Sequence, residues 1–307
     1  MTTLTSTTPR LLVPGIYALF GLDYPKQPKK YDAFMNTIVT DRAYIELQGM
    51  VGLGAATIKA ESAALDTDDM SQGLAQRLTN VAYGKEIAFS MEQVADDQYT
   101  PKLVSEVSSQ FALSMLKAEE LLCHDVLNSG FSTVSGGAAN MYTNPDAVAL
   151  FSASHLLDSG TFSNLVTASS LSQASMETAI TTMRNWVDDR GNKVMAEPMK
   201  LLVPTALEFV ARRLLESVLE PGSPNNDINT VKGAVELVVD PWLTSTTAHF
   251  YTTTMNTAKH GLIFQRRQEV MIDQYPDNHT KNEFFSCMSR MGTGYVTAFG
   301  VVGNAGA

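Results

Sequence analysis

The feature that most constrains the fold is a long amphipathic segment between Pro101 and Gly130. Its apolar residues recur in steps of three and four, the spacing that keeps side chains on one face of an α-helix. This stripe comprises Val104, Val107, Phe111, Met115, Ala118, Leu122 and Val126, and it is widened by Leu103, Leu113, Leu116, Leu121 and Leu127. Thr100 suits the N-cap, Pro101 the first turn, and Gly130 a left-handed C-cap. At about 1.5 Å per residue, a helix over 101–129 is roughly 40 Å long and crosses a whole domain.

The bulk composition indicates a globular, acidic chain. Its 307 residues leave room for about two domains, its 44% hydrophobic content supplies a sizeable core, and its formal net charge is −10. Without a run rich in Lys and Arg, such a chain has no general attraction for nucleic acid. No apolar run approaches the roughly 18 residues that span a bilayer, so we expect no membrane partner. Pro14 and Gly15 interrupt the apolar N-terminal run, which argues against a secretion signal.

The N-terminal region, residues 1–43, is interpreted as an extended arm. It is rich in Thr and Ser, contains several prolines and shows little periodicity. Its isolated apolar residues would be wasted in a monomer, but they make sense if the arm crosses a neighbouring surface. These residues are Ile16, Tyr17, Leu19, Phe20, Tyr31 and Phe34.

Residues 44–97 are interpreted as a long, protruding two-stranded loop. Strands are expected at 44–53 and 85–94, and the stretch between them is rich in Ala, Asp, Ser and Gly. A two-stranded hairpin is only marginally stable alone in water, so we expect this loop to be supported from outside.

The rest of the chain mixes helices and strands and shows no internal repeat. A second helix is expected from Leu171 or Ser172 to Asp188. A third follows Thr205, which forms a capping-box pattern with Glu208. Short apolar or strand-like runs lie at 147–151, 199–203, 235–239, 247–253, 262–264, 269–275, 283–290 and 294–302. The pattern predicts an α+β fold in which the last two runs pair antiparallel.

No set of residues matches a catalytic, cofactor-binding or metal-binding pattern. His155 follows a serine, but the chain lacks a Gly-x-Ser-x-Gly nucleophile elbow, so we interpret it as a loop or core histidine. Cys123 and His124 are adjacent on a helix and point in different directions, and Cys123 and Cys287 are interpreted as buried, reduced thiols. The other histidines lack partners at metal-ligand spacing: His249, His260 and His279. We therefore expect no catalytic residue, no cofactor, no metal and no enzymatic activity.

Three weaker patterns are interpreted as structural features and not as functional sites. An acidic run fails as a calcium loop because Met70 stands where the third oxygen ligand belongs. Two glycines in 52–54 lack the third glycine of a dinucleotide fingerprint, so they mark the end of a strand. Arg266 and Arg267 are interpreted as a solvated pair, or next as a subunit-interface salt bridge, rather than as a nucleic-acid contact. The acidic run comprises Asp66, Asp68 and Asp69.

Five segments carry a resemblance to a known family. They are AVALFSASH (147–155), GTFSNL (160–165), LSQASMETAITTMRN (171–185), EPMKLLVPTALEFVARRLLES (197–217) and VELVVDPWL (235–243). Each is weak alone. In this order and spacing they resemble the major capsid proteins of tailed bacteriophages with the HK97 fold, and most of all the Mu-like head proteins.

The resemblance implies a division of the chain into five parts. These are an N-terminal arm (1–43), an extended loop (44–97), a peripheral domain with the spine helix (98–145, helix 101–129), an axial domain (146–261) and further peripheral strands (262–307). Because no long, charged helical segment precedes the arm, we expect either a separate scaffold protein or a mature chain. Some relatives join subunits through a Lys–Asn isopeptide bond. Lys59 and Lys85 lie in the expected loop, but that chemistry needs a desolvated, deprotonated lysine beside a carboxylate, so we assign no cross-link.

The resemblance also implies a function. Copies of the chain would form pentamers and hexamers of an icosahedral head that encloses double-stranded DNA without sequence-specific binding. Further partners would be scaffold, portal and decoration proteins, and the virion would be assembled in the host bacterial cytoplasm. An encapsulin-like nanocompartment shell is the alternative within the fold. A soluble serine-type hydrolase that uses His155 is the alternative of another class.

Overall fold

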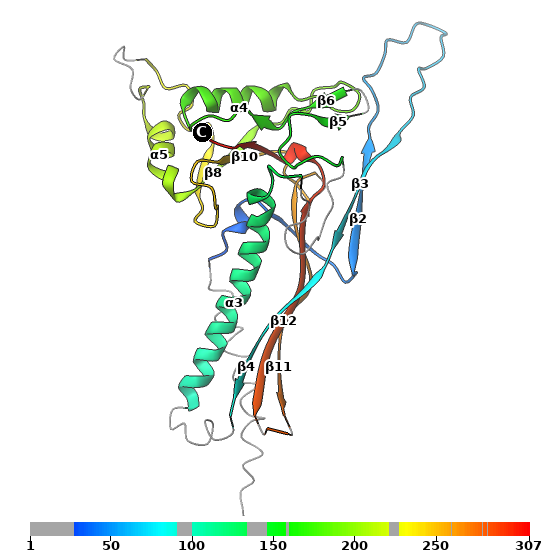
Figure 1. Ribbon diagram of the computed structural model, residues 1–307. Helices are drawn as coiled ribbons and strands as arrows, with labels where there is room; N and C mark the ends of the chain where they lie inside the picture. The colour runs from blue at the N-terminus through cyan, green and yellow to red at the C-terminus, as the bar shows by residue number, and fades with distance from the viewer. Residues whose placement is uncertain are drawn as a thin grey trace, which may run out of the picture.

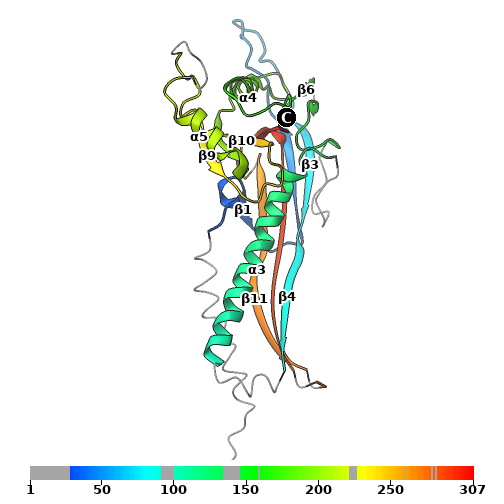
Figure 2. The ribbon, with the colours of Figure 1, turned by 60° about the vertical axis from the view of Figure 1, so that its left-hand side comes forward.

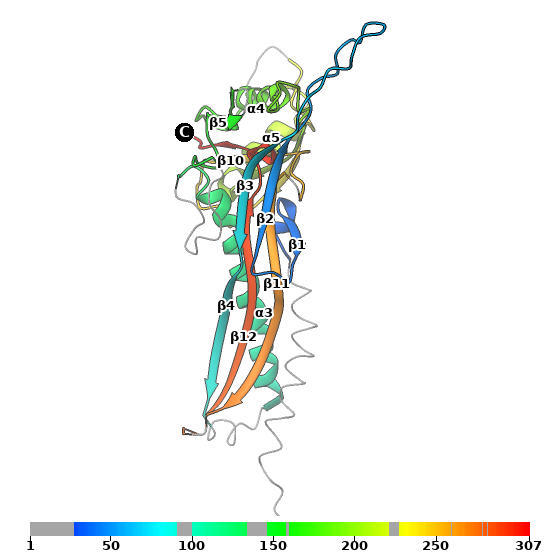
Figure 3. The same ribbon diagram turned by 90° about the vertical axis from the view of Figure 1, so that its right-hand side faces the viewer.

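The computed structural model describes residues 28–90, 100–133, 146–157, 160–220, 227–258, 260–277, 279–280 and 282–307. Two parts are evident (Figure 1). In the first, here called the rod, one long helix runs beside a four-stranded sheet. In the second, here called the lobe, two helices flank a five-stranded sheet. A β-hairpin projects beyond the lobe (Figure 3).

The long helix α3 spans Thr100–Asn128, which confirms the helix predicted over 101–129. It lies along the strands of the rod sheet (Figure 2). Phe111 and Met115 are buried among Ile272, Phe285 and other apolar residues of that sheet. The stripe is narrower than predicted, because Leu121 is 59% exposed.

The glycine at the end of α3 was predicted to be a left-handed C-cap, and this is wrong. Gly130 is not among the residues with positive φ. A Cβ at this position would lie 2.6 Å from Cε2 of Phe151. Glycine is therefore needed here so that the Phe151 ring can pack against the end of the helix.

The rod sheet has the strand order β1-β11-β12-β4. Its strands are β1 (Asn36–Val39), β11 (Leu262–Pro276), β12 (Glu283–Tyr295) and β4 (Val81–Phe89). β1 pairs parallel with β11, and the other pairs are antiparallel. The runs predicted at 262–264 and 269–275 form one strand, because register shifts between Arg266 and Met271 bend β11 without ending it.

The lobe sheet has the order β7-β13-β10-β8-β9, with a two-stranded pair, β5 and β6, beside it. Its strands are β7 (Leu165–Val166), β13 (Val301–Asn304), β10 (His249–Thr253), β8 (Pro198–Val203) and β9 (Glu236–Val239); the pair is β5 (His155–Leu157) and β6 (Gly160–Phe162). The strand predicted at 294–302 is wrong, and so is its antiparallel pairing with the run at 283–290, because residues 283–295 form the single strand β12, which pairs with β11 and β4. After β12, the turn η6 (Ala298–Gly300) redirects the chain, so that Val302 is buried in the lobe.

Two helices cover the lobe sheet. Helix α4 (Gln173–Asn185) begins at the N-cap Ser172, which forms a capping box with Ser175, and it ends three residues earlier than predicted. Helix α5 (Glu208–Glu216) follows a 3₁₀ turn, η5 (Thr205–Leu207). The predicted Thr205 cap is wrong because Thr205 lies inside this turn, and the N-cap of the turn, Pro204, has no side-chain donor or acceptor.

The hairpin consists of β2 (Tyr44–Val51) paired with β3 (Ser71–Thr79). This corrects the prediction that the partner strand lies at 85–94. Only Asn80 separates β3 from β4, and β4 pairs with β12 in the rod instead. Pattern reasoning missed β3 because it is polar, with the buried Gln76 at a core-facing position.

The residues that follow position 27 pack on their own chain, which corrects the arm prediction for Tyr31 and Phe34. Both side chains are buried, in the short turn η3 (Tyr31–Ala33) and just after it. They enter the same core as Phe264, whose ring centroid is 5.1 Å from that of Tyr31. The apolar burial available between α3 and β11 is the physical reason. The other arm residues named above lie outside the described part of the chain.

One composition-based expectation can be checked directly. Cys123 and Cys287 are buried and free, as predicted. Among the described residues, no helix is both long and apolar enough to cross a membrane.

The contact between α3 and the rod sheet gives a first prediction. Phe111→Ala should destabilise the protein by roughly 3–5 kcal/mol, because it leaves a cavity where a fully buried ring was packed. The matched change Leu121→Ala, on the exposed face of the same helix, should cost less than about 1 kcal/mol. Urea unfolding of the unassembled protein measures both. Equal losses would contradict the packing described here.

Candidate assembly surfaces and the junction that positions them

The most exposed part of the described chain is the tip of the hairpin, residues 52–70. Every residue in this segment whose burial is described is exposed. Its apolar side chains include Ile58, which is 100% exposed, and Leu65, at 74%. The tip projects away from the lobe (Figure 3). It therefore presents apolar surface that its own subunit does not cover.

Two glycines allow the hairpin strands to approach closely just before the tip. The register of β2 against β3 shifts between Gln48 and Met50. A Cβ on Gly73 would lie 3.2 Å from the carbonyl carbon of Gly49, and one on Gly49 would lie 3.2 Å from the carbonyl oxygen of Leu74. Such a bulge increases the local twist and re-aims the segment beyond it.

Arg190 of the lobe forms hydrogen bonds and an ion pair with residues at the root of the tip. From its Nη2 atom it donates to the carbonyl oxygen of Asp69 at 2.6 Å, and from Nε to that of Gly52 at 3.3 Å. The same guanidinium lies 3.3 Å from the carboxylate of Asp68. These contacts join the lobe to both strands of the hairpin at the point where their pairing ends.

The local turn around Arg190 is fixed by its own hydrogen bonds. Asp188 accepts from the backbone N–H of Arg190 at 2.9 Å and from that of Asn192 at 2.8 Å. Gly191, with φ of +79°, takes the left-handed position that this turn requires. Arg190 is therefore presented on a defined loop.

Asp68, which contacts Arg190, also joins the two sides of the hairpin at the root of the tip. Its carboxylate accepts from the backbone N–H of Gly54 at 2.7 Å. This bond, with a smaller contribution from Arg190, lowers the pKa of Asp68 below its usual value. An ionised Asp68 is thus favoured at neutral pH, where it can pair with the guanidinium.

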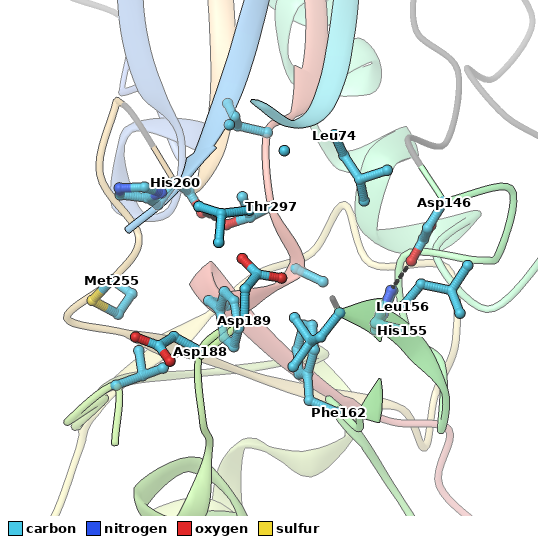
Figure 4. A pocket seen from close by; sticks show the side chains of 18 of the residues that line it. Leu74, Asp146, His155, Leu156, Phe162, Asp188, Asp189, Met255, His260 and Thr297 are labelled. Carbon is cyan, nitrogen blue, oxygen red and sulfur yellow. Dashed lines mark hydrogen bonds and ion pairs between the residues drawn. The ribbon is translucent and has the colours of Figure 1, made fainter. Parts of the chain in front are cut away.

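A cavity of about 480 Å³ lies between the root of the hairpin and the lobe. Leu74, Asp189, Phe162 and Thr297 are among the residues that line it (Figure 4). Its lining is mostly apolar and mixes residues of β2 and β3 with residues of the lobe. The hairpin is therefore not packed solidly against the lobe beside Asp188 and Asp189.

At the lobe end of α3, a buried ion pair joins the helix to the rod sheet. Glu119 is fully buried and accepts from Arg266 at 2.8 Å. The hydroxyl of Tyr31 donates to the other Glu119 oxygen at 2.8 Å. Arg266 is thus neither a solvated residue nor a subunit-interface ion pair, which corrects the sequence interpretation. Its neighbour Arg267 donates to the carbonyl oxygen of Asp41.

Two more buried polar groups of α3, on the next residue and one turn beyond it, join the helix to other segments. Glu120 accepts from the backbone N–H of Lys30 at 2.6 Å. His124 contacts the carboxylate of Asp240, which follows β9 in the lobe, at 2.6 Å. Together with the Glu119 pair, these contacts form what we call the junction. It connects the rod, the lobe and the segment before β1.

The candidates considered from sequence do not come together as a reactive site. His155 binds Asp146 through Nδ1 at 2.5 Å, and its Nε2 lies 3.1 Å from the Leu150 carbonyl and from the Asn164 side-chain oxygen. Both nitrogens are therefore occupied, which leaves no base for a serine. Burial lowers the pKa of His249, which favours the neutral form of this side chain.

The structure also places other residues that the sequence analysis singled out. Asp66 accepts from Thr57 within the exposed tip. Lys59 lies in the tip and Lys85 on β4, and both are exposed. β2 ends at Val51, so the glycines of 52–54 do mark the end of a strand, as predicted. In the described part of the chain, no three His, Cys, Asp or Glu side chains group as a metal site would require.

Pattern reasoning missed the junction and Arg190. A signal for the junction was present: Glu119 lies four residues after Met115 and three before Leu122, inside the apolar stripe of the helix. A carboxylate there must either be exposed or find a buried partner. Arg190 gave no comparable signal, because its partners, two backbone carbonyl groups and the carboxylate of Asp68, belong to residues far away in sequence.

Comparison with solved structures identifies the class of fold. The chain is similar to a structure of Mycobacterium phage Adephagia (TM-score 0.56, 12% identity, covering 92% of this chain and 91% of that one). It is also similar to the capsid of the cyanophage P-SCSP1u (TM-score 0.59, 8% identity, 92% and 89% covered). For the bacteriophage JBD30 capsid, the TM-score is 0.55 at 14% identity, with 71% and 92% covered. A comparison with curated proteins finds no match. The fold is the HK97-like fold of phage capsid subunits.

A family model described as phage capsid protein matches residues 75–299, well over half of the chain. The chain therefore belongs to the phage capsid protein family, and it is a major capsid protein that forms the shell of the head. Its copies assemble with one another into that shell, which places the protein in the virion. The Mu-like subtype stays a prediction.

The Arg190 contacts generate a second prediction. Arg190→Ala should make backbone amides at the root of the tip, such as that of Gly54, exchange severalfold faster, because the lobe no longer restrains the two strands. Arg184→Ala is the matched control, since it removes an exposed ion pair with Glu197 elsewhere on the lobe. Hydrogen exchange on the unassembled protein measures the effect. Identical exchange in the two variants would show that Arg190 does not hold the hairpin.

Proposed function

We propose that the subunits form pentamers and hexamers, that these close an icosahedral head around double-stranded DNA, and that the hairpin tip binds a neighbouring subunit. The observation that supports this most is the exposure of residues 52–70. Ordering a residue costs about 1–2 kcal/mol of backbone entropy, and this segment buries almost nothing on its own chain to offset that cost. A second copy supplies the missing surface.

The geometry favours a contact between different surfaces of successive copies. The tip lies well away from the rest of its own subunit (Figure 1). A tip that reaches a different part of the next subunit makes a head-to-tail contact, and such contacts close into rings when the rotation permits. Rings of five and six copies are the closed forms that tile an icosahedral shell.

The chain divides, in this proposal, into parts with distinct roles. The hairpin β2–β3 is the extended loop, the rod is the peripheral domain and the lobe is the axial domain. Relative to the divisions expected from sequence, η3 and β1 move from the arm to the peripheral domain, β4 moves from the loop to the peripheral domain, and β13 moves to the axial domain. The segment before η3 is the arm.

The net charge of the chain indicates how the subunit interacts with DNA. With a net charge of −10, the chain is suited to enclose DNA without tight or sequence-specific contacts. We further propose that scaffold, portal and decoration proteins take part in assembly in the bacterial cytoplasm. The subunit itself has no enzymatic role in this account, because His155 is fully engaged in structural hydrogen bonds. The match to the phage capsid protein family favours a phage head over an encapsulin-like shell.

Substitution in the tip tests this proposal. The double variant Ile58→Asp with Leu65→Asp should form capsomers or shells only at concentrations more than about tenfold higher than the unmodified chain. Each buried aliphatic side chain contributes roughly 1.5–3 kcal/mol to an interface, and about 1.4 kcal/mol is a factor of ten.

The conservative double variant Ile58→Val with Leu65→Met is the control and should assemble nearly normally. Sedimentation velocity and negative-stain microscopy measure assembly, and thermal unfolding of the unassembled subunits should be the same in all three proteins. Normal assembly of the aspartate variant would rule out the tip as an intersubunit contact.

A further inference from the structure

The junction contains a histidine whose two ring nitrogens both face acceptors. Nδ1 of His124 lies 2.7 Å from the backbone carbonyl oxygen of Glu120, which can only accept, so Nδ1 carries a hydrogen. Nε2 lies 2.6 Å from Oδ2 of Asp240. A proton must therefore also lie between Nε2 and Oδ2. The other oxygen of Asp240 already accepts from the backbone N–H of Trp242 at 3.0 Å.

Glu120 gives the junction a second proton-binding group. Oε1 accepts from Lys30, but Oε2 is buried without a hydrogen-bond partner and lies 3.4 Å from Nδ1 of His124. Burial is the main cause that raises the pKa of Glu120, and the charge of Asp240 raises it further. The N–H groups of Lys30 and Tyr31 and the charge of His124 act in the opposite direction.

The surroundings keep these protons from solvent and contain more acids than bases. The ring of Phe34 packs edge-on against His124 at 5.0 Å, and that of Trp242 lies at 6.4 Å. The other charged groups near the junction include Glu119 and Asp125 on α3, Asp32 and Lys30, both exposed, in the segment before β1, Arg266 on β11, and Lys200 on β8, which donates to the carbonyl oxygen of Ala33 at 2.9 Å. Arg266 already forms an ion pair with Glu119. Excess negative charge in a buried site favours bound protons.

We propose that Glu120, His124 and Asp240 form a proton-loaded latch, which holds the segment 28–35 and the lobe against α3 and loosens as pH rises. Loss of the shared proton would leave two acceptors facing each other at the His124–Asp240 contact. Ionisation of Glu120 would add a buried negative charge beside it. Because burial raises the pKa of Glu120 above that of a carboxyl group in the unfolded chain, the stabilisation that its proton gives is present in mild acid and is lost as the pH rises through the raised pKa.

The latch has a structural consequence at the start of the described chain. Lys30 and Phe34 both contact it, so its state contributes to how firmly the segment before β1 stays on its own subunit, beside the contacts that Glu119, Lys200 and Asn256 make with that segment. Asp240 belongs to the lobe, so the same protons also influence the angle between lobe and rod. This inference does not depend on the pentamers and hexamers proposed above.

Hydrogen exchange of residues 28–36 in the unassembled full chain tests the proposal. After correction for the intrinsic pH dependence of exchange, protection should fall by at least about tenfold between about pH 6 and about pH 9, a change that one lost buried hydrogen bond to a charged group can produce. Protection that does not change with pH would overturn the proposal, whatever the variants show.

Two variants separate the latch from general pH effects. In Asp240→Asn, an amide N–H takes the place of the shared proton and donates to neutral His124, so the segment should lose clearly less protection between the two pH values than it does in the unmodified chain. Glu120→Gln should remove only part of the pH dependence. Asp146→Asn is the matched control, because it makes the same change in the His155–Asp146 pair. The control should behave as the unmodified chain. Full pH dependence in Asp240→Asn would refute the latch.

Discussion

The structure depends on one long contact, the packing of α3 against the rod sheet, chiefly against β12 and β4. The helix buries Phe111 and Met115 against Ile272 and Phe285 of the sheet. Because a helix of this length cannot be covered by a compact lobe, the sheet must be equally long, and β11 is correspondingly the longest strand described. The elongated rod, the lobe at one end and the hairpin that leaves from β4 all follow from this contact.

Buried polar contacts near the lobe end of α3 fix the orientation of the lobe relative to the rod. Apolar packing alone is non-directional and would tolerate small rotations of the lobe. Buried pairs such as Glu119–Arg266 and His124–Asp240 have strict geometry, since a displaced partner leaves a charge unpaired in the interior. At the surface, the contacts of Arg190 orient the hairpin relative to the lobe in the same directional way. The assembly surfaces are thus oriented by a few directional contacts on a rigid frame.

The sequence predicted the periodic elements well and the long-range contacts poorly. The spine helix, α4 and both buried cysteines were predictable because each depends on local spacing and burial. Strand β3 was not, since Gln72 and Gln76 break its apolar pattern, and its pairing with β2 is fixed by where β4 joins the rod. The burial of Tyr31 and Arg266 depends on Glu119, far away in sequence, so no local pattern could reveal it. The resemblance to capsid proteins came from the order of weak motifs within the lobe.

The central claim is that residues 52–70 are completed only by a neighbouring copy. A cryo-electron microscopy map of particles assembled from this chain tests it directly. The account predicts that Ile58 and Leu65 of each subunit are buried against the adjacent subunit, with the hairpin lying across it. A map in which the tip folds back on its own subunit, or faces solvent on all sides, would contradict the account.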